Sequence, residues 1–166
     1  MDRDALGKPR LRHQPVGAGV ELSVSHCRGR AMIAISSEGA IGIDVEAVHP
    51  IPDMDGIADA YFTPEEASTI GHASGDRKVE AFFNCWTSKE AYTKALGTGL
   101  RTPLDSFVIS GATSSAGGVT TGRIRGQTWT LFRLAPWAGH TAAVVVAGRV
   151  PESAFSVKGD RVIGDP

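Results

Sequence analysis

The chain has 166 residues, of which 42% are hydrophobic and 21% are charged, and its formal net charge is −1. These values are ordinary for one globular domain, and the near-neutral charge lacks the basic excess expected of a nucleic-acid-binding surface. No apolar run approaches the roughly 20 residues that cross a bilayer, and no signal peptide opens the chain. We therefore expect a cytoplasmic protein that binds neither nucleic acid nor membrane. The two cysteines, Cys27 and Cys85, do not have a zinc-site spacing, and we expect both to be free thiols.

The first predicted elements are β-strands. An extended arm at 1–19 is rich in glycine, proline and basic residues. Two alternating segments, 20–24 and 31–35, then flank a glycine turn and predict a β-hairpin. A third strand covers 41–48 and ends at two prolines.

Two helices are predicted after this strand. Thr63 is a typical N-cap residue, Pro64 occupies the first helical position and two acids follow, so a helix begins there and ends near Gly71. A second helix starts near Asp76 and runs to Leu96.

The pattern becomes β-rich again after Pro103. Strands are predicted at 106–110, 122–127, 128–134 and 141–147, with a last short strand at 154–157. A flexible loop is predicted at 111–118. The order of strands, helices and a final β-meander predicts an α+β fold with an antiparallel sheet packed on helices. We expect one domain over 1–166, with its core at 20–150 and a tail at 151–166.

The third predicted strand carries two acids on one face. Alternation points its apolar residues toward a core. Asp44 and Glu46 then lie on the opposite side, where Gly42 leaves room beside them. Two neighbouring carboxylates repel each other unless a cation lies between them, and oxygen ligands favour Mg²⁺ or Ca²⁺. The alternative is a solvated strand face, which is the usual environment of acids.

The second predicted helix carries Trp86, Glu90 and Lys94 in one stripe, because they are four residues apart. The simplest interpretation is a surface ion pair worth roughly a few tenths of a kcal/mol. Beside a metal-bound phosphate, Lys89 and Lys94 would instead neutralise its charge. We predict that Trp86 packs the helix onto the sheet and fixes where Glu90 points. Gly97 is expected to end the helix in a left-handed conformation.

Ser25 and His26 end the first strand of the hairpin and could donate hydrogen bonds to a phosphate. A nucleophilic serine with a histidine base is the alternative. Adjacent strand residues point to opposite faces, so these two side chains are poorly placed to hydrogen-bond each other. We therefore favour anion contacts.

Together, these motifs resemble those of the Sfp-type 4′-phosphopantetheinyl transferases. The matching segments, in the order of the family, are Gly7-Lys8-Pro9, Ser25-His26, Gly42-Ile43-Asp44-Val45-Glu46 and the run from Trp86 to Leu100. The last run also looks like the smaller holo-acyl-carrier-protein synthases of the same superfamily, but the Asp-Val-Glu spacing and Trp86 favour the Sfp branch. Most of the first half of that family has no counterpart here. We expect Arg10, Arg12, Arg28 or another chain to replace its contacts with the 3′-phosphate of coenzyme A.

The resemblance implies an enzyme that transfers 4′-phosphopantetheine from coenzyme A to a serine of an apo acyl or peptidyl carrier protein. Asp44, Glu46 and Glu90 would hold Mg²⁺, and Asp44, Glu90 and Lys94 would be catalytic. The implied contacts with coenzyme A are Lys8, Pro9, Ser25, His26, Lys89 and Lys94. Glu90, or a water on the metal, would accept the proton of the serine, and 3′,5′-ADP would leave.

Two points stay open at this level. The alternative function is a non-catalytic module that binds coenzyme A or a carrier protein. By analogy with the smaller relatives, we also expect a homo-oligomer, or else a part of a larger synthase.

Overall fold

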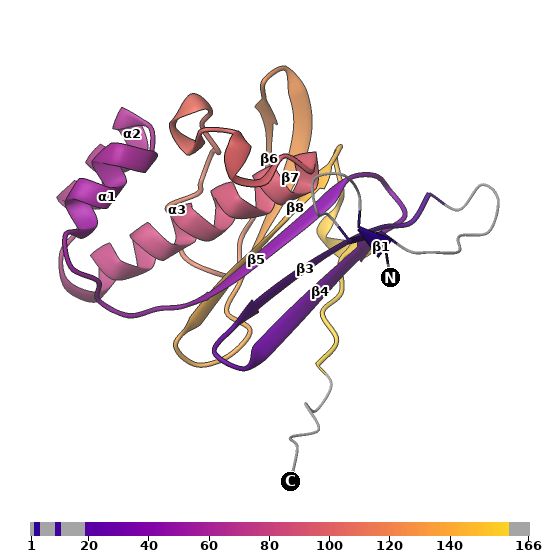
Figure 1. Cartoon of the computed structure of the whole chain (residues 1–166), viewed down its shortest axis with the longest axis horizontal. Helices are drawn as coiled ribbons and strands as arrows, with labels where there is room; N and C mark the ends of the chain where they lie inside the picture. Colours follow the sequence, from indigo (N-terminus) through magenta and orange to yellow (C-terminus); the bar gives the residue numbers. More distant parts are fainter. Residues whose placement is uncertain (1, 4–8, 11–18, 160–166) are drawn as a thin grey trace, which may run out of the picture.

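The computed structural model describes residues 2–3, 9–10 and 19–159 of the chain. These residues form the predicted α+β fold, with an antiparallel sheet packed on helices (Figure 1). The elements are β1 (Asp2–Arg3), β2 (Pro9–Arg10), β3 (Glu21–Cys27), β4 (Arg30–Ser36), β5 (Ile41–Ala47), α1 (Met54–Tyr61), α2 (Pro64–His72), α3 (Gly75–Leu96), η1 (Gly99–Arg101), η2 (Leu104–Ser106), β6 (Val119–Ile124), β7 (Gln127–Leu134), β8 (His140–Ala147) and η3 (Glu152–Ala154). None of the described helices combines the length and apolar character needed to cross a membrane.

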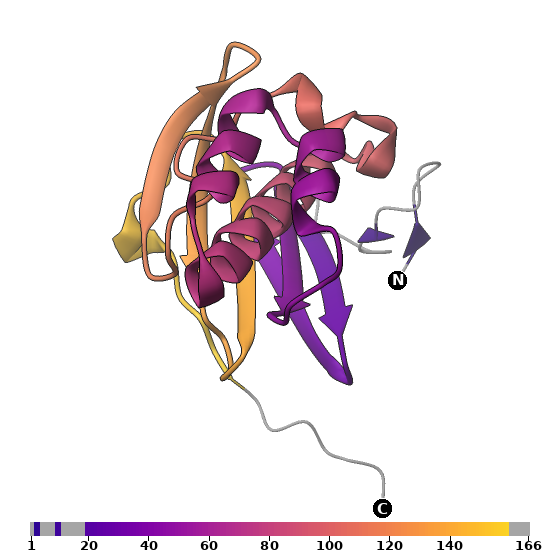
Figure 2. The same ribbon diagram turned by 90° about the vertical axis from the view of Figure 1, so that its left-hand side faces the viewer.

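The main sheet has four antiparallel strands in the order β5-β8-β7-β6. The last three strands form the predicted meander, because each pairs with its neighbour in the chain. Figure 2 shows the three α-helices on one side of this sheet, and α3 packs directly against β5 and β8. The longest helix therefore lies over the strand that carries the acidic motif.

The β3–β4 hairpin is a separate two-stranded sheet that lies beside β5. Two serine hydroxyls of β3 connect it to the main sheet. Ser23 Oγ accepts a hydrogen bond from the backbone N–H of Ile43 at 3.1 Å, and Ser25 Oγ accepts one from Val45 at 3.2 Å. Side-chain oxygens thus take the place that carbonyl oxygens of a neighbouring strand would have.

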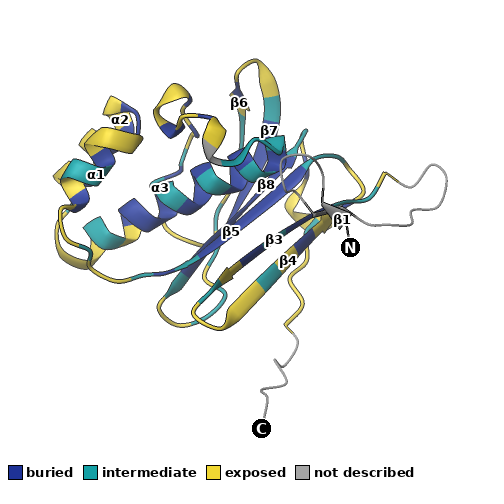
Figure 3. Cartoon of the chain, viewed as in Figure 1, coloured by how far each residue is buried: buried dark blue, intermediate teal, exposed yellow. Residues whose placement is uncertain are grey.

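Apolar clusters cover both faces of the main sheet, which is why β5 and β8 are buried along their length (Figure 3). The tail contributes to the cluster away from α3, where Phe155 stacks on Phe132 with ring centroids 4.2 Å apart. The predicted strand at 154–157 does not form; η3 and irregular chain occupy this region. The buried members of this second cluster are Ala34, Ile41, Ile43, Phe132, Val144, Val146 and Val150.

Two helix starts illustrate where local signals succeed and fail. In α2 the Thr63 hydroxyl accepts the backbone N–H of Glu66, whose carboxylate accepts the N–H of Thr63, so the predicted start is a complete capping box. Helix α1 was not predicted. Asp53 precedes it in a left-handed conformation, with φ 53°, and its side chain does not cap the helix. Aspartate is a preferred N-cap residue, so its type is the usual one for a helix start, but here its side chain does not make the capping hydrogen bond.

The strand predicted at 106–110 is also wrong. Its polar backbone groups pair with side chains instead of a neighbouring strand. The carbonyl of Phe107 accepts a hydrogen bond from Lys89, and the N–H of Ile109 donates one to Glu66. This segment consequently packs beside the helices and not in the sheet.

Candidate active site

A buried polar group lies where β3, β5 and α3 meet. Ser25 Oγ donates a hydrogen bond to Asp44 Oδ1 at 2.9 Å. Lys94 Nζ donates to the same carboxylate oxygen at 2.7 Å and to Ser25 Oγ at 3.2 Å. The fold thus brings together three predicted site residues from three elements.

Helix α3 reaches Asp44 because Gly42 allows a very close approach. A Cβ atom at position 42 would lie 1.9 Å from the carbonyl oxygen of Ala91 and 2.4 Å from the backbone nitrogen of Ala95. The room that Gly42 was predicted to leave is filled by the backbone of this helix. The same contact brings Lys94 over the strand.

The two oxygens of Asp44 have different environments. Oδ1 accepts both hydrogen bonds, whereas Oδ2 is buried and has no hydrogen-bond partner within the described part of the chain. The residue is only 4% exposed. A buried carboxylate oxygen without a donor is costly, and a hard cation is one group that would satisfy it.

Glu46 and Glu90 are half-buried and feel the charge of Asp44. Burial raises the pKa of Glu90, and the charges of Asp44 and Glu46 raise it further, whereas Lys94 lowers it. Burial and Asp44 likewise raise the pKa of Glu46, against lowering contributions that include a hydrogen bond from the Cys27 thiol. The three acids therefore form one electrostatically coupled group.

These acids fit a divalent cation by their chemistry. They are not a preassembled cluster, because no three acidic, histidine or cysteine side chains converge as a metal site among the residues that the structure describes. Three coupled carboxylates with one unpartnered buried oxygen nevertheless offer ligands of the type that Mg²⁺ prefers, which are oxygens. Asp44, Glu46 and Glu90 are thus the residues that could hold it.

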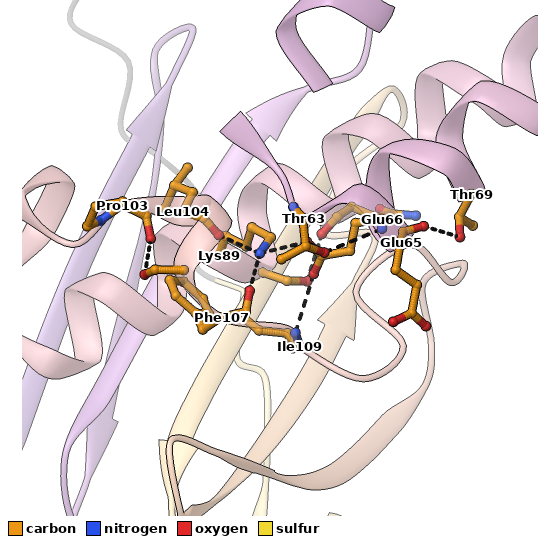
Figure 4. Close-up of polar contacts among 12 residues, drawn as sticks. Thr63, Glu65, Glu66, Thr69, Lys89, Pro103, Leu104, Phe107 and Ile109 are labelled. Carbon is orange, nitrogen blue, oxygen red and sulfur yellow. Dashed lines mark hydrogen bonds and ion pairs between the residues drawn. The ribbon is translucent and has the colours of Figure 1, made fainter. Parts of the chain in front are cut away.

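Lys89 has other partners, which lie in α2 and in the 104–107 segment (Figure 4). Its side chain is 0% exposed, and Nζ contacts Glu66 Oε2 at 2.7 Å. The same ammonium donates to the carbonyls of Leu104 at 2.7 Å and Phe107 at 2.6 Å. Because it has three partners and no exposure to solvent, the predicted phosphate contact of Lys89 is not supported. Lys94, whose side chain is 30% exposed, is the accessible lysine.

The other predicted contacts with coenzyme A divide into three cases. Ser25 belongs to the buried group, whereas His26, the next residue of β3, is exposed, which is the alternation that argued against a nucleophilic pair. Pro9 lies in β2, which pairs with β1. Lys8 is outside the described residues.

Trp86 does not pack the helix onto the sheet as predicted. Its half-buried ring lies 6.4 Å from the ring of Tyr61 and 6.2 Å from that of Phe62, between centroids, and it stacks on Phe82. It therefore packs α3 against the end of α1, the helix that the sequence did not reveal.

The role of Glu66 was also missed. Its capping-box position was the only local signal, and nothing near it in the sequence indicates the ion pair with Lys89.

Comparison with known proteins yields a consistent set of relatives. A family model described as "4′-phosphopantetheinyl transferase superfamily" matches residues 40–146. The 4′-phosphopantetheinyl transferase HetI of a Nostoc species is 32% identical over 148 residues, which cover 89% of this chain and 60% of HetI. The 4′-phosphopantetheinyl transferase Sfp of Bacillus subtilis is 34% identical over 103 residues, which cover 62% of this chain and 43% of Sfp. The chain thus matches about half of the length of these relatives.

Among solved structures, the holo-(acyl-carrier-protein) synthase of Bacillus anthracis in complex with coenzyme A is 22% identical. The superposition covers 65% of this chain and 94% of that one, with a TM-score of 0.49.

Proposed function

The chain belongs to the 4′-phosphopantetheinyl transferase superfamily, and on this premise we propose that it transfers 4′-phosphopantetheine from coenzyme A to a serine of an apo acyl or peptidyl carrier protein. The reaction is Mg²⁺-dependent and releases 3′,5′-ADP. A new bond forms between the serine oxygen and the β-phosphorus, and the bond from that phosphorus to the oxygen of the departing 3′,5′-ADP breaks.

The observation that carries this proposal is the environment of Asp44. Its carboxylate is buried, has one oxygen without a donor within the described residues, and lies beside the accessible ammonium of Lys94. Two further acids are coupled to it. Such a combination suits a pyrophosphate that arrives with a divalent cation, because the acids attract the cation and the lysine attracts the phosphate.

Each residue then has a defined task. Asp44, Glu46 and Glu90 would hold Mg²⁺, which would supply Lewis-acid stabilisation of the charge on the transferred phosphate. Lys94 exchanges its contact with Asp44 for one with the phosphate and neutralises part of its charge.

Glu90 accepts the proton of the attacking serine. A carboxylate has two oxygens and several lone pairs, so Glu90 could be a cation ligand and still accept a proton. Without a cation, burial and the charge of Asp44 raise the pKa of Glu90. Ser25 holds Asp44 and Lys94 in place through its hydroxyl.

The direct test is the intact mass of an apo carrier protein after incubation with the chain, coenzyme A and Mg²⁺. Carriers of the fatty-acid, polyketide and peptide-synthase types should be tried, because the sequence does not identify the carrier. The expected result is a mass increase equal to one phosphopantetheine group on at least one of them. If coenzyme A binds but no carrier gains this mass at high enzyme concentration, the chain is a binding module and the proposed transfer is wrong.

A further inference from the structure

The buried ion pair of Lys89 and Glu66 has no part in the proposed reaction, yet Lys89 directly precedes Glu90. The two side chains are 0% and 5% exposed, and their charged atoms are 2.7 Å apart. A buried ion pair is weak evidence for stability, because well-packed apolar residues in its place are often at least as stable. The ion pair is therefore better explained by the orientation that it gives to the helix.

The pair joins three segments of the fold (Figure 4). Lys89 Nζ donates to two carbonyls of the 104–109 segment. The Glu66 carboxylate accepts the N–H of Thr63 at 3.1 Å and its hydroxyl at 2.8 Å, and it also accepts the N–H of Ile109. The start of α2, the middle of α3 and the 104–109 segment are thus held at one point.

A second contact holds α3 from the side of the sheet. There the helix backbone at Ala91 and Ala95 rests on Gly42 of β5. Two anchors on different sides restrict rotation of the helix about its own axis. Because successive residues of an α-helix are about 100° apart around that axis, the anchor at Lys89 sets the direction of Glu90.

We propose that Lys89 is a positioning residue, whose ion pair with Glu66 fixes the rotation of α3 and thereby points Glu90 and Lys94 toward Asp44. This inference rests on the proposed function, since it concerns the same carboxylates. It assigns Lys89 no contact with substrate.

The test is a double-mutant cycle of Lys89→Met and Glu66→Gln in the full chain. Three quantities are measured for each variant: the melting temperature, the transfer rate from the carrier mass, and the affinity for Mn²⁺ from electron paramagnetic resonance. Activity is compared at a temperature at which every variant is folded. Lys89→Met should lower the transfer rate and the Mn²⁺ affinity by roughly 10- to 100-fold, as loss of outer-shell support does in metal enzymes.

The double variant separates positioning from stability. It should regain part of the melting temperature lost by Lys89→Met, because Glu66 no longer leaves an unpaired buried charge. Its transfer rate and Mn²⁺ affinity should remain low, because α3 still lacks its anchor. The matched control is Lys78→Met on the same helix, which removes an ion pair with exposed Asp55 and should change neither transfer nor Mn²⁺ binding.

Two outcomes would overturn the proposal: a double variant that regains transfer together with its melting temperature, or a Lys89→Met variant that transfers as fast as the wild type. If the wild type transfers nothing, the proposed function fails instead, and the Mn²⁺ affinities of the same variants still decide the positioning role. A wild type without transfer and without Mn²⁺ binding overturns both.

Discussion

Asp44 shows how one side chain can be both well held and incompletely satisfied. Ser25 and Lys94 donate to one of its oxygens, while the other is buried without a donor among the described residues. Strand alternation places Asp44 and Glu46 on one face, so this part of the site follows from the sequence. The environment of each oxygen does not, because it depends on how closely α3 approaches.

The first residue-level prediction concerns Asp44→Asn. The change removes a charged ligand but keeps the size of the side chain, so transfer should fall by at least about 100-fold, the upper end of what outer-shell losses produce. Folding should be retained, because repulsion with Glu46 and Glu90 is relieved. Transfer is measured by carrier mass and folding by circular dichroism. The matched control, Asp55→Asn, removes an exposed acid of α1 and should leave transfer intact; equal losses in both variants would contradict the assignment.

The second residue-level prediction concerns the pKa values of Glu46 and Glu90, which lie above the ordinary value of 4.5. A carboxyl group with a raised pKa binds its proton more tightly in the folded state. Its contribution to stability is therefore present at low pH and is lost as pH rises through the raised pKa. Carbon NMR titration of the two side-chain carboxyl groups in cation-free buffer measures both pKa values, which should lie above 4.5.

The charge of Asp44 is a cause of both shifts, so Asp44→Asn should lower both pKa values toward 4.5. Titration curves that are the same in the variant and the wild type would rule out the coupling.

Among the elements, α3 and β5 determine the geometry of the site. Their close contact at Gly42 was not predicted, since a glycine in a strand can mark a bulge, a bend or the close approach of another backbone. The wrong strand at 106–110 has a similar cause: the partners of its backbone are Lys89 and Glu66, which are remote in the sequence. Local patterns were reliable where the signal was local, as at the capping box of α2 and at Gly97, which ends α3 with φ 74°.

The element-level prediction compares two glycine substitutions. Gly42→Ala forces a Cβ atom against the backbone of α3, which cannot yield as a flexible side chain would, so it should destabilise the fold by about 1–3 kcal/mol or more. Gly71→Ala, in α2, meets no atom within 4 Å and should stabilise by about 0.5–1 kcal/mol through higher helix propensity. Urea unfolding measures both. Similar stabilities for the two variants would show that α3 does not press on β5.

At the scale of the whole molecule, the fold class and most elements follow from periodicity and turn residues. The boundary of β6 shows the limit of this approach. The sequence suggested a strand through 122–127, but Arg125 and Gly126 both adopt positive φ and form the two-residue turn between β6 and β7. Helix α1 was not predicted, and the prediction for Trp86 failed with it, because its partner Tyr61 belongs to that helix.

The fold assembles the candidate site from distant parts of the chain. The hairpin supplies Ser25, the strand beside it supplies Asp44 and Glu46, and the long helix supplies Glu90 and Lys94. The strand and the helix lie within the residues matched by the family model, whereas the hairpin lies outside them. The proposed activity depends on the convergence of these segments.

The most direct test of this account is the carrier mass after incubation with coenzyme A, first with a chelator and then after Mg²⁺ is added back. We predict no phosphopantetheine transfer in the chelator, full transfer on Mg²⁺ addition, and no such recovery for Asp44→Asn. Transfer that proceeds equally with and without the chelator, or a variant that recovers like the wild type, would contradict the assignment of Asp44, Glu46 and Glu90 as the Mg²⁺ site.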